Sequence, residues 1–275
     1  MSDNNFTIFA QSDLETIKYR NLIIDLGNGL KTNAQLTIPA IGKGPFPGVV
    51  IFPRAGAGSV LSPTSPYSDM ADYLSDREFV VLRYDKSGVW PNFTISDSNA
   101  WGNLTFNALK QDAEKALSVL LQQPEVNATK KATLIGHSEG TNIPPRVAVD
   151  NPDKVTNIVL MAPVVEKWID IIYSQEVAYP LLYAERISDK GQTGQLSVEE
   201  ASRDPIFQRL VGGNLTQLLL TMTNVSDNRN GTLPGQNNRT DDDLINIEDE
   251  LKPALVRVYE NDTHLQLPYS CQPNA

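Results

Sequence analysis

The sequence is poor in the side chains that several kinds of functional site require. Its 275 residues include a single cysteine, Cys271, which excludes an internal disulfide framework and a cysteine-rich zinc site. Only two histidines are present, His137 and His264, so any mechanism with a histidine base must use one of them. These histidines and the scattered carboxylates lack the spacing of metal ligands, and we expect no metal and no cofactor.

Basic residues are also scarce. The chain has 23 Lys and Arg against 33 Asp and Glu, a net charge of −10, which argues against nucleic acid as a partner. No window of 18 apolar residues occurs, so we expect no membrane span. The first eleven residues lack the basic start and apolar core of a signal peptide, which favours a cytoplasmic location for the sequence as written.

Glycosylation sequons favour the opposite location. Nine Asn-x-Ser/Thr sequons occur, where about three are expected from the composition. They begin at Asn5, Asn92, Asn103, Asn127, Asn214, Asn224, Asn230, Asn238 and Asn261. Either the chain comes from an Asn- and Thr-rich proteome, or it is an extracytoplasmic, glycosylated protein whose export signal is not in this sequence.

Strand and helix patterns alternate along the first 165 residues. We expect strands at 17–25, 30–39, 47–52, 79–84, 132–135 and 155–161. Helices are expected at 65–77, at 103–123 and after Ser138. The short, continuously apolar strands indicate burial on both faces. This alternation predicts an α/β fold with a doubly wound, mostly parallel sheet.

The alternation of strand and helix patterns ends at about residue 165. Amphipathic helices are expected at 168–186 and 210–223, followed by a polar loop at 224–243. The apolar run at 253–259 then predicts a further strand. We therefore expect residues 1–165 and 251–275 to form one core, with 166–250 inserted as a helical lid that contributes to acyl or alcohol specificity.

A candidate nucleophile lies in the run Gly136-His137-Ser138-Glu139-Gly140, which fits the pattern G-x-S-x-G. An apolar strand precedes it and a helix is expected to follow, the context in which this motif forms a sharp strand-to-helix turn. The glycines let strand and helix approach closely, and the helix N-terminus stabilises developing negative charge. The alternative is a purely structural serine that caps a helix after a glycine turn.

The loop after the strand at 47–52 supplies the second half of an oxyanion hole in this arrangement. Its run of small residues permits a close approach by the backbone, and we assign the two donors to the N–H groups of Ala55 and Glu139. Arg54 stands where glycine is more usual. It either faces the substrate or pairs with a surface carboxylate.

With these motifs and the run from Leu82 to Gly88, the sequence resembles the α/β-hydrolase superfamily, and within it esterases related to dienelactone hydrolases and prolyl-oligopeptidase-like enzymes. The resemblance covers about residues 15–165 and 251–268. It implies a Ser-Asp-His triad in that chain order and hydrolysis of small acyl esters. Thr141 departs from the family pattern, since another glycine is frequent there.

The resemblance implies that Asp262, after the strand at 253–259, is the triad acid. Asp85 is the competing carboxylate, and we expect it instead to brace the nearby loop. His264 is the candidate base, although the family places its histidine after one further strand. His137 lies inside the turn and is expected to be a packing residue. We therefore expect the printed sequence to lack the last strand and helix of the fold.

Three functions fit the sequence. The first is a serine esterase that uses Ser138, Asp262 and His264, or a base beyond the printed sequence. The second is a non-catalytic relative that binds an acyl ligand or a partner protein. The third is an acyltransferase on the same fold.

Overall fold

The computed structural model describes residues 16–89, 95, 97–102, 104–188, 193–211, 244–257 and 259. The chain divides into two compact units, Met1–Val164 and Val165–Ala275. In the described part of the chain, no helix combines the length and apolar character that a bilayer crossing requires.

The first unit is built on a six-stranded sheet with the order β1-β2-β4-β3-β5-β6. The strands are β1 (Ile17–Gly27), β2 (Leu30–Pro39), β3 (Gly48–Phe52), β4 (Val80–Tyr84), β5 (Ala132–His137) and β6 (Val155–Met161). β1 and β2 form an antiparallel hairpin and β2 pairs antiparallel with β4, whereas β4, β3, β5 and β6 are mutually parallel. The mostly parallel sheet predicted from the sequence is confirmed, and all six expected strands are present.

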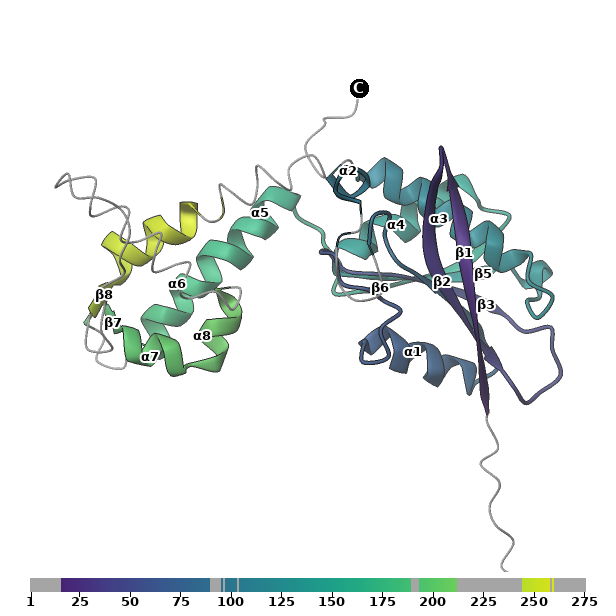
Figure 1. Cartoon of the computed structure of the whole chain (residues 1–275), viewed down its shortest axis with the longest axis horizontal. Coiled ribbons are helices and arrows are strands. Elements are labelled where there is room, and N and C mark those ends of the chain that lie inside the picture. The colour runs from purple at the N-terminus through teal and green to yellow at the C-terminus, as the bar shows by residue number, and fades with distance from the viewer. Residues whose placement is uncertain are drawn as a thin grey trace, which may run out of the picture. The chain divides into compact units, whose positions relative to one another are not determined.

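Helices cover both faces of this sheet. α1 (Pro66–Ser75) contacts β4 and β2, whereas α3 (Phe106–Leu121) and α4 (Ile143–Asp150) contact each other and the strands from the opposite face (Figure 1). A short helix, α2 (Ser98–Gly102), precedes α3. All residues of β3 and β4 are buried, as expected of central parallel strands.

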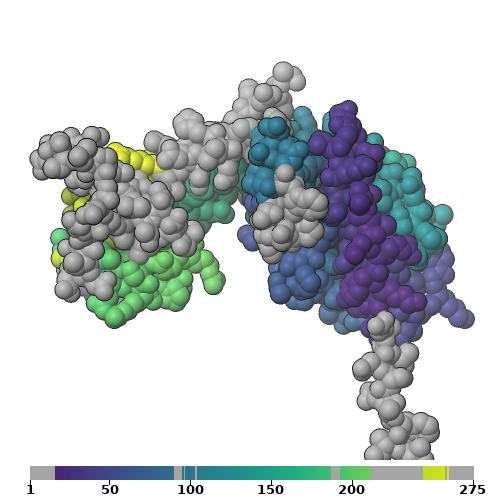
Figure 2. Space-filling model, viewed as in Figure 1, coloured from purple at the N-terminus to yellow at the C-terminus, as the bar shows by residue number. Residues whose placement is uncertain are grey.

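The hairpin of β1 and β2 forms one margin of the sheet and runs along the surface in purple in Figure 2. Its two-residue turn is Asn28-Gly29, and both residues have positive φ, as a type I′ hairpin turn requires. Most residues of β1 are exposed, and Ile24 is its one buried residue, as expected of a strand at the margin of a sheet.

The second unit has a hydrophobic core of its own. A long helical segment runs through α5 (Trp168–Tyr173), η3 (Ser174–Ala178), α6 (Tyr179–Tyr183) and η4 (Ala184–Ser188), which confirms the helix expected at 168–186. Two short strands, β7 (Gln195–Ser197) and β8 (Leu244–Asn246), pair antiparallel, and α7 (Val198–Arg203) and α8 (Pro205–Leu210) follow β7. The sequence patterns did not predict this small sheet.

The prediction of a strand at 253–259 is wrong. The described residues there continue a helix that begins with η5 (Ile247–Leu251) and extends through 252–257. Leu251, Ala254 and Leu255 are buried in the core of the second unit, and their i, i+3, i+4 spacing places them on one helix face. The Asn246 side chain caps this helix by accepting a hydrogen bond from the Asp249 N–H (2.8 Å).

The same observation corrects the expected domain boundaries. Residues 251–257 were expected to return to the hydrolase sheet with residues 1–165, but they pack with the second unit, which spans Val165–Ala275. Val256, Val258 and Tyr259 have high strand propensity, yet burial of Leu251, Ala254 and Leu255 on one helical face decides the conformation of 251–257. The helix expected at 210–223 and the polar loop at 224–243 lie almost entirely outside the described residues.

Candidate active site

Ser138 lies at the sharp turn that the sequence predicted. β5 ends at His137, Ser138 begins the 3-10 helix η2 (Ser138–Asn142), and α4 follows directly. The φ angle of Ser138 is +54°, a left-handed backbone conformation that non-glycine residues rarely adopt. Such strain persists where the surrounding structure enforces it, and it is common at functional sites.

The two glycines of the motif are required by close contacts. A Cβ atom on Gly140 would lie 2.5 Å from the Pro53 carbonyl oxygen and 2.7 Å from that of Phe52. A Cβ atom on Gly136 would collide with the carbonyl of Gly140 and lie 2.8 Å from the Thr141 Cα. Glycine at these two positions therefore lets the turn fold back on β5 and pack against the end of β3.

Thr141, where the family pattern favours glycine, has a structural role. Its hydroxyl donates a hydrogen bond to the Ser138 carbonyl (2.6 Å) and accepts one from the backbone N–H of Val164 (3.1 Å). The side chain amide of Asn142 donates to the Glu139 carbonyl (3.0 Å). These bonds tie the turn to the segment that follows β6.

The two expected oxyanion donors belong to segments that the structure brings together. Glu139 is the second residue of η2, so its N–H has no acceptor inside the helix. The loop that begins at Pro53 packs against the turn at Gly140, and Ala55 lies two residues further along it, half-buried. The Arg54 side chain is exposed, and it has no ion-pair partner in the described part of the chain.

Tyr67, in the helix predicted at 65–77, connects these two segments. Its buried hydroxyl accepts a hydrogen bond from the backbone N–H of Arg54 (3.0 Å) and lies 2.8 Å from Nδ1 of His137. Burial and the nearby Arg54 charge lower the pKa of His137, and burial raises the pKa of Tyr67. His137 thus packs against α1, as expected, with Nδ1 occupied by Tyr67.

Asp85 braces the loop after β3, as predicted. Its carboxylate accepts hydrogen bonds from the Ser59 hydroxyl (2.9 Å) and from the Val60 N–H (2.8 Å). Burial raises the pKa of Asp85, and these hydrogen bonds act in the opposite direction. Both oxygens of Asp85 are therefore engaged in holding the loop.

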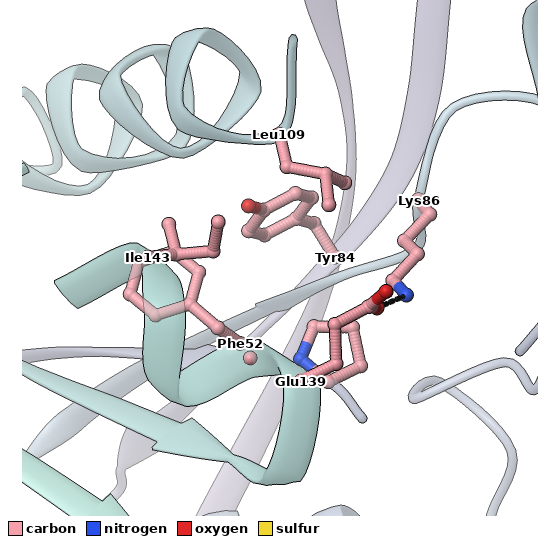
Figure 3. Close-up of a pocket in the computed structure, with 8 residues that line it drawn as sticks. Phe52, Tyr84, Lys86, Leu109, Glu139 and Ile143 are labelled. Atoms are coloured by element: carbon pink, nitrogen blue, oxygen red, sulfur yellow. Dashed lines mark hydrogen bonds and ion pairs between the residues drawn. The ribbon is translucent and has the colours of Figure 1, made fainter. Parts of the chain in front are cut away.

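A buried ion pair lies beside the turn. Lys86, in the loop after β4, pairs with the carboxylate of Glu139, and both side chains are almost completely inaccessible to solvent. Figure 3 shows this pair at a small cavity of about 10 Å³, which is close to the minimum for one water molecule. The remaining lining is mostly apolar: Phe52, Pro53, Tyr84, Leu109, Gly140 and Ile143.

The other two residues of the expected triad, Asp262 and His264, lie outside the described residues. The strand that was expected to present Asp262 is absent, since 252–257 is helical. His137 is thus the only histidine in the part of the chain that the structure describes. The structure describes Ser138, Ala55 and Glu139, and the roles assigned to these residues, to Asp262 and to His264 stay predictions.

The sheet and its glycine-flanked turn define an α/β hydrolase. The chain belongs to the serine aminopeptidase S33 family, whose model matches residues 60–214, more than half of the sequence. No similar sequence was found among curated proteins.

Several solved structures are similar to this chain. A dienelactone hydrolase-like promiscuous phosphotriesterase from metagenomic libraries is 24% identical with a TM-score of 0.42, over 53% of this chain and 59% of its own. A cold-adapted esterase from an Arctic intertidal metagenomic library is 16% identical with a TM-score of 0.40, over 53% of this chain and 61% of its own. A bacterial heroin esterase is 17% identical with a TM-score of 0.44, over 61% of this chain and 51% of its own. The chain thus spans less than two thirds of the length of each of these relatives.

Proposed function

We propose that this chain is a serine hydrolase that cleaves a carboxylic ester or a related acyl bond through an acyl-enzyme on Ser138. The observation that carries the proposal is the φ of +54° at Ser138, in a turn that only glycine at positions 136 and 140 allows. A serine held in this way at the N-terminus of a helix is the arrangement that exposes a nucleophile to substrate.

In the proposed reaction, Ser138 Oγ attacks the acyl carbonyl carbon while its proton passes to a general base. The N–H groups of Ala55 and Glu139 donate to the oxyanion that forms, and the alcohol leaves as the acyl-enzyme is made. Water then attacks the acyl-enzyme, which releases the acid and regenerates Ser138. We assign the base to His264, oriented by Asp262.

Hydrolysis of p-nitrophenyl acetate tests the proposal. We expect turnover by the parent chain and its loss in Ser138→Ala, with equal protein concentration and equal unfolding midpoints for the two. Ser202→Ala, a change at an exposed serine of α7, is the matched control and should leave turnover unchanged. Turnover that persists in Ser138→Ala would contradict the proposal.

We propose acyl esters as the substrate class and no narrower group of substrates. Residues 166–250 were expected to form a lid. Leu181, in this segment, belongs to the core of the second unit, so packing accounts for this apolar side chain. The lid and its part in specificity remain a prediction.

A further inference from the structure

The ion pair of Lys86 and Glu139 involves the residue that directly follows the proposed nucleophile. Glu139 is anchored in η2 by its backbone, and its carboxylate turns inward to the Lys86 ammonium. Lys86 comes from the loop after β4, which is a different part of the sheet. The pair therefore joins the turn after β5 to the end of β4, on the other side of β3 in the sheet (Figure 3).

The neighbours of the pair offer Glu139 no other cation. In the described residues, Lys86 is the one side chain that forms an ion pair with Glu139. Two other buried carboxylates bind residues of these loops: Asp85 accepts from Ser59 and Val60, and Asp112 accepts from the Ser87 hydroxyl (2.8 Å). The Trp101 ring lies 5.9 Å from the Lys86 ammonium and adds a favourable contact for the cation.

Stability alone does not explain such a pair. Removing two charges from water costs about as much as their attraction returns, and apolar residues of similar size often serve the fold as well. Breaking the pair has a different consequence, because it leaves one charge buried without a partner. Here that charge would be a carboxylate on the residue whose N–H is the proposed oxyanion donor.

We propose that Lys86 is a positioning residue for the proposed hydrolysis: it holds and neutralises the Glu139 carboxylate, so that no unpaired negative charge faces the oxyanion. This inference rests on the proposed function of Ser138. An unpaired carboxylate would oppose both the removal of the Ser138 proton and the negative charge that develops on the acyl oxygen. The effect falls on the transition state rather than on the uncharged ester, and so on kcat rather than KM.

Lys86→Met should lower kcat for p-nitrophenyl acetate by about 10- to 100-fold and change KM by less than about twofold. In the double variant Lys86→Met/Glu139→Gln, the second substitution removes the charge of the carboxylate and keeps its shape. We expect kcat of the double variant to be at least about tenfold higher than that of Lys86→Met. Lys110→Met is the matched control, because Lys110 also forms an ion pair, with Asp150, but at the surface. The competent fraction of each variant is counted by titration with a fluorophosphonate.

The double variant separates this role from a purely structural one. If the pair serves only to hold the turn in place, Lys86→Met/Glu139→Gln should be as slow as Lys86→Met, because the pair is broken in both. If Lys86 balances the charge of Glu139, the double variant should regain kcat while KM stays unchanged. A double variant as slow as the single one, or a loss in Lys86→Met that falls on KM rather than on kcat, would overturn the inference.

Failure of this inference is distinct from failure of the proposed function. If the parent shows no hydrolysis that depends on Ser138, the proposed function fails and the inference fails with it. If the parent is active and Lys86→Met retains its kcat, only the inference fails. Where Lys86→Met does not fold, a folded double variant with at least a tenth of parent kcat supports charge balance, and an inactive one contradicts it.

Discussion

The Tyr67 hydroxyl lies 2.8 Å from Nδ1 of His137, the residue that directly precedes Ser138. The same oxygen accepts a hydrogen bond from the backbone N–H of Arg54, which directly precedes Ala55. One buried phenol therefore connects the nucleophile turn with the loop that is proposed to complete the oxyanion hole. Its removal tests how far these two segments depend on each other.

Tyr67→Phe should lower the free energy of unfolding by about 1–3 kcal/mol, because it leaves the Arg54 N–H and His137 Nδ1 without this partner. Urea unfolding measures the change. Tyr73→Phe is the control, since Tyr73 is on the same helix but exposed, and it should change stability by less than about 0.5 kcal/mol. Equal stability of the two variants would show that the bridge contributes nothing.

Gly140→Ala should destabilise the chain by at least about 1–3 kcal/mol and abolish ester hydrolysis, because the new methyl group meets the Pro53 and Phe52 carbonyl oxygens. Gly102→Ala is the control: a Cβ there has nothing within 4 Å. Thermal unfolding and hydrolysis of p-nitrophenyl acetate are measured for both. Parent-like stability and turnover in Gly140→Ala would contradict the close packing of the turn on β3.

Thr141→Val removes the hydroxyl that joins the Ser138 carbonyl to the Val164 N–H. We expect a loss of about 1–2 kcal/mol in the free energy of unfolding, and recovery of most of it in Thr141→Ser, which retains the hydroxyl. Chemical denaturation compares the three proteins. If Thr141→Ser is no more stable than Thr141→Val, the hydroxyl is not what holds the turn.

Asp112 should make stability depend on pH. Burial raises the pKa of its carboxyl to about 6, despite the hydrogen bond from Ser87, whereas the unfolded value is about 3.9. Between about pH 4 and pH 6 the native state therefore binds more protons than the unfolded state. The stabilising contribution of Asp112 to the free energy of unfolding is full below about pH 4 and is lost as the pH rises through about 6.

Asp112→Asn stays neutral and retains an acceptor for Ser87. It should exceed the parent in free energy of unfolding by about 2–3 kcal/mol at pH 8, and this difference should shrink steadily towards pH 5. Asp153→Asn, at an exposed aspartate, is the control and should show no such trend. Urea titrations at a series of pH values give the comparison, and a difference that does not vary with pH would refute the assignment.

The sequence was sufficient to predict the hydrolase unit because its signals are local. The apolar runs at β3 and β4 are too short for helices and are flanked by turn residues, so periodicity and length agree. The G-x-S-x-G spacing reflects steric contacts of Gly136 and Gly140 that any such turn must satisfy. Ser138 was therefore identifiable without knowledge of its neighbours.

The features that could not be predicted depend on distant contacts. Tyr67 reads as one apolar position of an amphipathic helix, and nothing in its surroundings in sequence indicates that it meets Arg54 and His137. Residues 252–257 read as a strand by composition, but burial of Ala254 and Leu255 in the second unit favours a helix. Asp262 was assigned on the basis of that strand, and its role stays a prediction.

The central claim is that Ser138 is an activated nucleophile, and covalent labelling tests it most directly. The parent chain is treated with a fluorophosphonate probe, digested and mapped by mass spectrometry, with Ser138→Ala as the comparison. We predict one adduct, on Ser138, that forms within minutes and is absent from Ser138→Ala. An unlabelled parent chain, or an adduct on another serine that persists in Ser138→Ala, would contradict the claim.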